Sequence, residues 1–283
     1  MKTRRRLLSL GLLAALMAAA SILAGCAATR GKHAASHSIV TFNLYHDKAD
    51  WPQRRALIVD ELRALNPDVI VLQEVLQHET LRNQAEDLAE ALGYSAYFLS
   101  IDPAGNPRRY GNAILTRHAI LSRDWTALRP PEDSRSAGWA RIDLDGQPLN
   151  VYVTHPNYQN DDAGRRMRSQ QLADLQAFIA RTAGDVPSVV AGDFNTVSAQ
   201  PELAALEAGH DNAYDALHGR ADPRPTLNPH YFPNDSRRID HVYLQRRALR
   251  PLEARIVLDR EGAPGVWPSD HFGMYVRFAF APR

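Results

Sequence analysis

The chain has 283 residues, a formal net charge of +1 and a single cysteine, Cys26. One cysteine excludes a disulfide framework, and a net charge this small argues against a protein that holds polyanionic DNA through a strong basic excess. No internal repeat, coiled-coil heptad or low-complexity tract interrupts the sequence.

The first 25 residues have the pattern of a bacterial secretory signal peptide. A basic start with Lys2 and residues 4–6 is followed by an apolar stretch from Leu7 to Leu23. A transmembrane anchor is the alternative, but the small residues in the second half of the stretch favour cleavage. Cleavage removes four of the 33 basic residues and none of the 32 acidic ones, so the mature chain has 29 against 32, a net charge of −3.

The quartet Leu23-Ala24-Gly25-Cys26 resembles the processing site of bacterial lipoproteins, which are cut before the cysteine and acylated on it. The resemblance implies lipidation of Cys26, and Ala27 rather than Asp at the next position implies the outer membrane of the bacterial cell envelope. Two or three acyl chains would anchor the protein firmly. We therefore expect a signal peptide at 1–25, a lipidated tether at 26–37 and one monomeric domain at 38–283.

Strands and helices alternate along this domain. We predict strands over residues 38–44, 67–72, 94–99, 111–116, 119–125, 138–144, 148–154, 188–191, 239–244 and 273–280. We predict helices over residues 52–65, 81–92 and 162–183, and a helical turn over 201–207. Many strands with hairpins and a few long helices indicate two packed sheets with helices outside, rather than a parallel Rossmann sheet. No glycine-rich phosphate loop is present.

Acidic or histidine-bearing clusters follow several of the apolar runs. Glu74 comes after a deeply apolar strand and suits Mg²⁺, which prefers carboxylate oxygens, although a surface position in a loop is equally plausible. Asp193 and Asn195 lie two apart on an extended segment and so point the same way. Asp193 can take a proton from water while Asn195 donates to a phosphate oxygen; the alternative is a turn that caps a following helix.

Three further positions complete the set. Asp270 is a second candidate metal carboxylate beside His271, and Asp240 can orient the His271 imidazole. An ion pair with Arg238 is the structural alternative for Asp240. His155 can donate to a phosphate, although a single histidine at a strand end is more often structural. Together the clusters predict a phosphoester-cleaving site built around a hard divalent cation.

As a series, the motifs resemble those of the endonuclease/exonuclease/phosphatase superfamily, whose fold is also called deoxyribonuclease-like. The resemblance is carried by Thr41-Phe42-Asn43, Leu72-Gln73-Glu74, Tyr110-Gly111-Asn112-Ala113-Ile114-Leu115, Thr154-His155, Gly192-Asp193-Phe194-Asn195, Arg238-Ile239-Asp240-His241 and Ser269-Asp270-His271. It implies an α+β fold, a four-layer α/β/β/α sandwich of two packed mixed sheets.

The resemblance also implies a role for each site residue. Glu74 and Asp270 would hold Mg²⁺ or Mn²⁺ with Asn43 near the same cluster, and Asp193 would activate water. Asn195, His155 and His271 would bind the phosphate, and Asp240 would set the His271 ring. On the helix after His155, Arg168 and Gln171 are expected to be mainly structural.

Three functions follow from this reading. The first is a membrane-anchored phosphodiesterase or phosphatase that acts on lipid headgroups or small phosphoesters, which the acidic mature chain and the lipid anchor favour. The second is a nuclease that acts on DNA or RNA, which the breadth of the superfamily favours and the charge disfavours. The third is a non-catalytic binding lipoprotein; no Glu, Asp or His of the motif set is missing, so hydrolysis ranks above binding.

Overall fold

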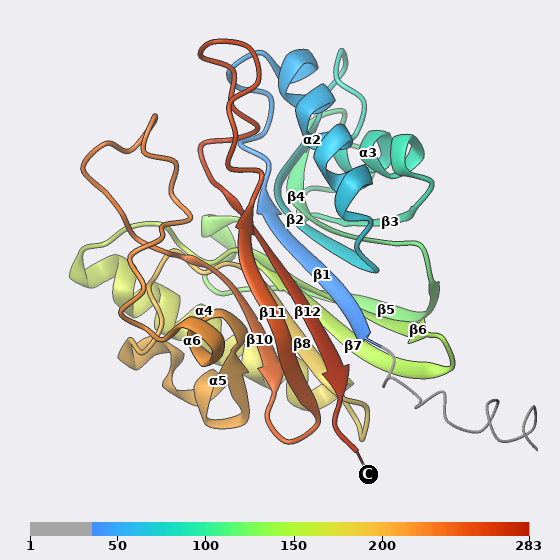
Figure 1. Ribbon diagram of the computed structural model, residues 1–283, viewed down its shortest axis with the longest axis vertical. Helices are drawn as coiled ribbons and strands as arrows, with labels where there is room; N and C mark the ends of the chain where they lie inside the picture. Colours follow the sequence, from blue (N-terminus) through green and yellow to red (C-terminus); the bar gives the residue numbers. More distant parts are fainter. Residues whose placement is uncertain (1–35, 283) are drawn as a thin grey trace, which may run out of the picture. The chain divides into compact units, whose positions relative to one another are not determined.

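Two six-stranded mixed sheets, drawn in Figure 1, form the centre of the domain. The computed structural model describes residues 36–282, so the predicted signal peptide and Cys26 lie outside the described residues. The first sheet has the order β11-β12-β1-β2-β4-β3, with β1 Ser36–Asn43, β2 Val69–Gln77, β3 Ser95–Leu99, β4 Arg109–Thr116, β11 Leu249–Val257 and β12 Gly273–Phe280. The second has the order β5-β6-β7-β8-β10-β9, with β5 Ala119–Ala127, β6 Ser136–Leu144, β7 Gln147–Thr154, β8 Ser188–Asp193, β9 His210–Asn212 and β10 Asp240–Gln245.

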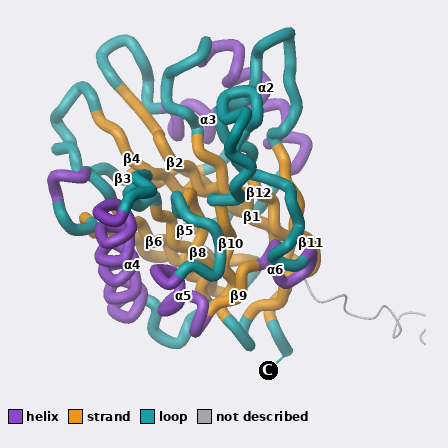
Figure 2. Tube along the Cα trace, turned by 90° about the vertical axis from the view of Figure 1, so that its left-hand side faces the viewer, coloured by secondary structure: helices purple, strands orange, loops and turns teal. Residues whose placement is uncertain are grey.

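Helices cover the outer faces of both sheets, as the side view in Figure 2 shows. The helices are α2 Trp51–Leu65, α3 Gln84–Leu92, α4 Asp162–Thr182, α5 Ala204–Gly209 and α6 Ala213–His218, with single 3₁₀ turns η1 Pro131–Asp133 and η2 Pro201–Leu203. The first sheet packs against α2 and α3, and the second against α4 and α5. The predicted four-layer α/β/β/α sandwich is therefore confirmed.

The alternation of side chains along the strands accounts for these layers. In β2, Val69 and Val71 face the core between the two sheets, whereas Ile70 and Leu72 face the helices. In β8, Val190 packs toward α4 while its neighbours on both sides face the inter-sheet core. Successive strand residues point to opposite faces, so a continuous apolar run is what a strand needs when both of its faces are buried.

Several predicted boundaries differ from the structure. The helix predicted from residue 81 begins at Gln84, because the Asn83 side chain accepts hydrogen bonds from the backbone N–H groups of Ala85 and Glu86 and caps the helix there. β1 begins at Ser36, so Ser36 and His37 belong to the sheet and not to the expected tether. The helical turn predicted over 201–207 is η2 followed by α5.

The sequence reading missed β9, β11 and α6. β11 contains Pro251 and three charged residues, which hide its strand character. It is an edge strand of the first sheet, where proline is tolerated, and its pairing with β12 is irregular between Pro251 and Glu253.

The parallel pairings bring the ends of several strands to one edge of the sandwich. β1 runs parallel to β2, with Asn43 opposite Gln73, and β7 runs parallel to β8, with Thr154 opposite Gly192. β10 runs antiparallel to β8, so its first residue, Asp240, lies opposite Asp193. The residues that follow β1, β7 and β8 and those that open β10 therefore converge.

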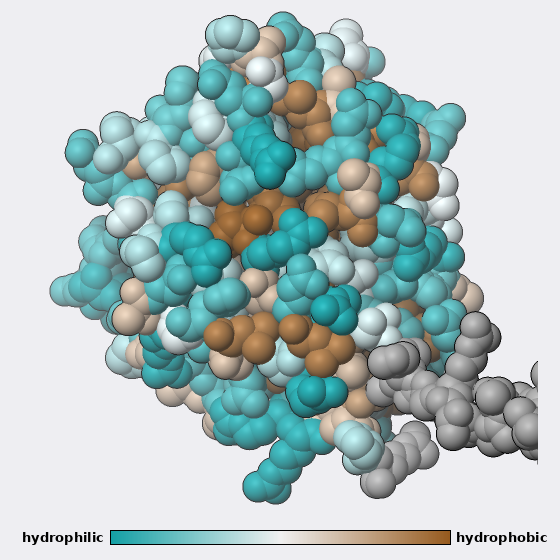
Figure 3. Space-filling view, viewed as in Figure 1, coloured by the Kyte–Doolittle hydropathy of each residue, from teal (hydrophilic) through white to brown (hydrophobic). Residues whose placement is uncertain are grey.

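The surface drawn in Figure 3 is mainly hydrophilic, and the apolar side chains on that face form separate patches. Within residues 36–282, no helix has the length and hydropathy needed to cross a membrane. The monomeric state stays a prediction.

Candidate active site

Asp193 is the centre of the site, at the carboxyl end of β8. The residue is 1% exposed. One oxygen, Oδ2, accepts a hydrogen bond from Asn43 Nδ2 at 3.1 Å and lies 3.4 Å from His155 Nε2. The other, Oδ1, accepts the backbone N–H of Asn195 at 2.9 Å. Three chain segments, at the ends of β1, β7 and β8, therefore meet at one buried carboxylate, which fixes its orientation.

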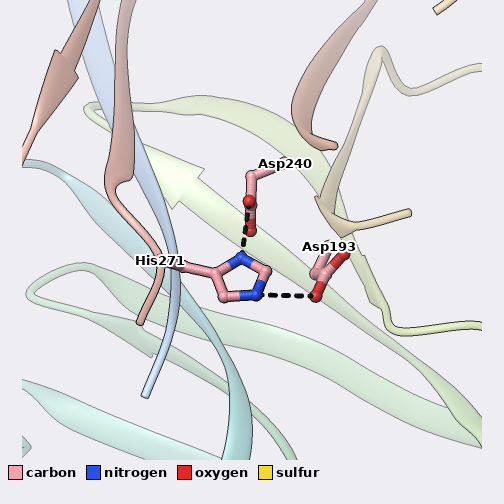
Figure 4. A group of neighbouring side chains, drawn as sticks. All are labelled: Asp193, Asp240 and His271. Carbon is pink, nitrogen blue, oxygen red and sulfur yellow. Dashed lines mark hydrogen bonds and ion pairs between the residues drawn. The ribbon is translucent and has the colours of Figure 1, made fainter. Parts of the chain in front are cut away.

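His271 lies between two carboxylates, as Figure 4 shows. Its Nδ1 is 2.9 Å from Asp240 Oδ2, and its Nε2 is 3.8 Å from Asp193 Oδ2. The backbone N–H of His271 donates to Ser269 Oγ at 3.1 Å, and Ser269 Oγ donates to the carbonyl of Asn43 at 2.7 Å. The loop before β12 is thus tied to the end of β1, and the ring orientation follows from the hydrogen bond to Asp240.

The electrostatics of these groups give them distinct protonation states. Burial, and then the charge of Asp240, raises the pKa of Asp193 to about 6. Burial alone would lower the pKa of His271, but the charges of Asp240 and Asp193 outweigh it and hold the pKa well above its ordinary value. Burial lowers the pKa of His155 well below its ordinary value. At neutral pH, His271 is therefore an imidazolium, His155 a neutral imidazole, and Asp193 a carboxylate near its titration point.

His155 and Asn195 lie beside Asp193, at the ends of β7 and β8. Asn195 has a left-handed backbone with φ of 53°, and its Nδ2 donates to the carbonyl of Pro156 at 3.1 Å. This hydrogen bond joins the loop after β8 to the loop after β7. Both residues lie where the sequence placed them, and their contact with a phosphate stays a prediction.

Glu74 lies within β2 and not after it, because the strand continues to Gln77. The pairing of β2 with β4 is irregular between Leu72 and Val75, and Glu74 has a left-handed φ of 56°. Such a bulge reorients one side chain without ending the strand. The Glu74 side chain is 21% exposed, and its Oε2 lies 4.0 Å from His46 Nε2.

Glu74 and Asp270 have the chemistry of a site for a hard cation. The pKa of Asp270 is raised to about 6, mainly by burial and also by the charges of Glu74 and Asp193, whereas the charge of His271 opposes the shift. Carboxylates that repel one another in this way are stabilised by a divalent cation, and carboxylate oxygen is the ligand that Mg²⁺ and Mn²⁺ prefer. The residues present therefore fit such an ion.

Asn43, predicted to lie near the metal, contacts the general base Asp193 in the structure. Its Nδ2 donates to Asp193, and its Oδ1 accepts the backbone N–H of Tyr45 at 3.0 Å. The side chain thus positions Asp193 in this structure, and a contact between Asn43 and a metal stays a prediction.

Asp193, Asp240 and His271 also form a cluster whose potential ligand atoms lie within 4.8 Å of one another. Distance alone allows a metal there. However, the His271 Nδ1 is engaged by Asp240, and a raised imidazole pKa favours a proton over a metal on the ring. The arrangement is better explained as an imidazolium that is hydrogen-bonded to the Asp240 carboxylate and forms a longer ion pair with the Asp193 carboxylate.

Arg168 and Gln171 of α4 hold the loop after His155, as expected of structural residues. Arg168 NH1 donates to the carbonyl of Asn157 at 3.2 Å, and Gln171 Oε1 accepts the backbone N–H of Asn157 at 2.7 Å. The sequence reading missed Tyr110, which lies beside Glu74, and Arg135, which lies beside His155. Tyr110 is the first residue of the quoted motif that ends at Leu115, and this position is the one sequence signal for a role in the site. Arg135 has no such signal.

Comparison with known proteins agrees with the fold and the motif set. Residues 40–271 match the Endonuclease/Exonuclease/phosphatase family. Nocturnin of Mus musculus is 26% identical over 257 residues, a match that covers 81% of this chain and 59% of that protein. The chain spans 26% to 59% of the length of the first curated relatives that it matches.

Solved structures show the same fold. The human Nocturnin catalytic domain with bound sulfate anion has a TM-score of 0.70 at 23% identity, covering 89% of this chain and 95% of that one. D. rerio TDP2 complexed with single strand DNA product has a TM-score of 0.71 at 20% identity, covering 86% and 99%. Because the family match extends over most of the sequence and contains every residue of the site described above, the chain belongs to the endonuclease/exonuclease/phosphatase family.

Proposed function

We propose that this protein is a divalent-cation-dependent phosphoesterase that cleaves its substrate by in-line attack of water on phosphorus. One observation carries the proposal: the buried Asp193 carboxylate, with a pKa of about 6, lies against one neutral and one protonated imidazole. A base with a pKa near the working pH combines a usable deprotonated fraction with enough basicity to accept a proton from water.

Each residue then has a defined task. Asp193 accepts the proton of the attacking water, and Asn43 and the Asn195 backbone hold its oxygens in place. His271 presents positive charge to the phosphoryl oxygens, and Asp240 keeps the ring oriented and protonated. His155 and Asn195 donate to the phosphate. Charge stabilisation by fixed donors in a dry site is the largest contribution expected in such a reaction.

Glu74 and Asp270 would hold Mg²⁺ or Mn²⁺. Bound there, the ion supplies positive charge that offsets the charge of the phosphate. The raised pKa of Asp270 supports this assignment, because burial and, to a lesser extent, the charge of Glu74 disfavour an isolated Asp270 carboxylate that a cation would stabilise.

For the substrate, we propose lipid headgroups or small phosphoesters, which the net charge of −3 of the processed chain and the proposed lipid anchor support. The alternative is DNA or RNA, which the similarity to TDP2, solved with a single-stranded DNA product, supports. A binding-only lipoprotein is disfavoured, since no carboxylate or imidazole of the motif set is missing from the site.

We further propose that Cys26 carries the lipid anchor and that the protein is attached to the bacterial outer membrane. The sequence pattern before Cys26 supports this.

The test of the function uses Asp193→Ala and His271→Ala, assayed with bis-p-nitrophenyl phosphate, plasmid DNA and phospholipid or sphingolipid vesicles in Mg²⁺. Each variant should lower turnover by at least about 10²-fold while circular dichroism stays unchanged. Wild-type turnover in both variants would reject the assigned site. The substrate hydrolysed fastest by the wild-type protein decides between the two substrate classes.

A further inference from the structure

Two buried arginines near the site already have protein partners for most of their donors. Arg54 of α2 is 0% exposed, and its guanidinium donates to the carbonyls of Leu44 at 2.7 Å, Lys48 at 2.8 Å and Pro268 at 2.8 Å. Arg168 of α4 is 2% exposed and pairs with Glu202 at 2.9 Å. These cations fix the loops around the site and have few donors left for a ligand.

Arg135, the residue directly before β6, has fewer protein partners than either of these arginines. Its side chain is 13% exposed, and its nearest ion pair, with Asp133, is long at 3.8 Å. The Asp133 oxygens already accept hydrogen bonds from Asn157 Nδ2 at 2.9 Å and from Gln171 Nε2 at 2.7 Å. Among residues 36–282, the one hydrogen-bond partner of the Arg135 side chain is the carbonyl of His155, at 3.5 Å. A guanidinium has five N–H donors, so most of these donors lack a protein partner.

The Arg135 guanidinium lies beside residues of the candidate active site. Arg135 lines a small hollow together with Tyr110, Asn112, Ser136 and His155. Its charge adds to the effect of burial in lowering the pKa of His155, and it acts on Tyr110, which also lies in the field of Glu74 and Asp193. The guanidinium thus lies beside His155, which contacts the general base Asp193, and beside Tyr110, which lies next to Glu74.

We propose that Arg135 binds a non-bridging oxygen of the phosphate under attack, next to His155. This inference rests on the proposed phosphoesterase function. A largely buried cation whose only ion pair is long, with a carboxylate that other donors already engage, is costly, and an incoming phosphate would lower that cost. The planar fork of a guanidinium matches two phosphate oxygens, which an ammonium does not. Charge that develops on those oxygens during attack would strengthen the contact in the transition state.

The test compares Arg135→Gln and Arg135→Lys with a control, Arg129→Gln. Arg129 lies in the same connection between β5 and β6, but its side chain is 68% exposed and pairs with Asp174 of α4. With bis-p-nitrophenyl phosphate, we expect kcat/KM to fall about 10²-fold in Arg135→Gln, less in Arg135→Lys, and by less than about 2-fold in the control. Arg135→Gln turning over like the control would overturn the inference.

Two further measurements separate a direct contact from a structural effect. In Arg135→Ala, added guanidinium at non-denaturing concentration should restore part of the activity; no rescue, with an unchanged Tm, would count against a direct contact. In EDTA, inorganic phosphate should raise the Tm of the wild type and of Arg129→Gln but not of Arg135→Gln. Equal shifts in all three proteins, or no shift in the wild type, would also overturn the inference.

The phosphate measurement needs no catalysis. If the wild-type protein hydrolyses none of the substrates, the proposed function fails, while the Tm shifts still show whether Arg135 binds phosphate. If the wild type is active and Arg135→Gln is unaffected, the function stands and the assignment of Arg135 fails.

Discussion

His241 provides a test of the electrostatics behind the site, because it lies next to Asp240 in β10 but faces away from the chemistry. It is fully buried. Its Nε2 lies 3.0 Å from the carbonyl of Thr196, and its Nδ1 lies 3.1 Å from the amide nitrogen of Asn212. The Asn212 oxygen caps α6 by accepting from Tyr214 and Asp215, so the amide must present its N–H to the ring. The partners therefore assign a neutral imidazole, protonated on Nε2 only.

Burial lowers the pKa of His241 from its ordinary value of 6.5 to about 4. Because the folded pKa lies below the unfolded one, the neutral ring stabilises the fold fully above pH 6.5, and this stability is lost as the pH falls toward 4. The difference between the unfolded and folded pKa of His241 corresponds to about 3 kcal/mol of folding stability, of which about 2 kcal/mol is lost by pH 5. Asp193 and Asp270, with pKa values raised to about 6, act in the opposite direction and gain stability in acid.

Because these contributions oppose one another, the pH dependence of wild-type stability alone does not report on His241. The measurement therefore compares the stability of the wild type with that of a His241 variant at two pH values. The free energy of unfolding is obtained by urea titration in EDTA at pH 7 and pH 5 for the wild type and for His241→Asn. At pH 7 the variant should be less stable by about 1–3 kcal/mol, because buried hydrogen bonds are lost. At pH 5 the gap should narrow by about 2 kcal/mol. An equal gap at both pH values would refute the assignment of a neutral, buried His241.

Three other predictions concern the site and the anchor. EDTA should abolish hydrolysis and Mg²⁺ should restore it, measured with bis-p-nitrophenyl phosphate; full activity in chelator would exclude a role for a cation at Glu74 and Asp270. Asp240→Asn should lower kcat about 10²-fold or more, because His271 loses the partner that orients and charges it. Asp235→Asn, which removes a surface ion pair with Arg237, is its control and should leave kcat within about 2-fold. Cys26→Ser should move the protein from the membrane to the soluble fraction; retention of the variant on the membrane would favour an uncleaved helix.

The layered architecture could be predicted from the sequence because it depends on local patterns. A strand with both faces buried needs an unbroken apolar run, and the run before Glu74 and the run before Asp193 show it. The clusters at the strand ends also proved informative, since parallel strands bring their ends to one edge. Asn43, His155, Asp193, Asp240 and His271 indeed meet there.

The missed features depend on pairing between distant segments. The sequence ends the strand at Leu72, yet β2 continues past Glu74 because β4 pairs with both sides of the bulge. β11 is a strand because it pairs with β12 at the edge of the first sheet, although its charged residues have a low strand propensity. Arg135 has no local pattern that separates it from a surface arginine; the loop after His155 and the side chain of Gln171 decide its surroundings.

The division of the site between the two sheets links its chemistry to the packing of the core. Asn43, Glu74 and the loop that carries Asp270 and His271 belong to the first sheet, whereas His155, Asp193 and Asp240 belong to the second. The contacts that define the chemistry cross between them: Asn43 to Asp193 at 3.1 Å and His271 to Asp240 at 2.9 Å. Hydrogen bonds weaken steeply with misalignment, so a small shift of one sheet over the other would break both. The close-packed apolar core between the sheets prevents such a shift, because its side chains interdigitate at crystal-like density. The packing that stabilises the fold therefore also holds the general base Asp193 and the His271 imidazolium in place relative to each other.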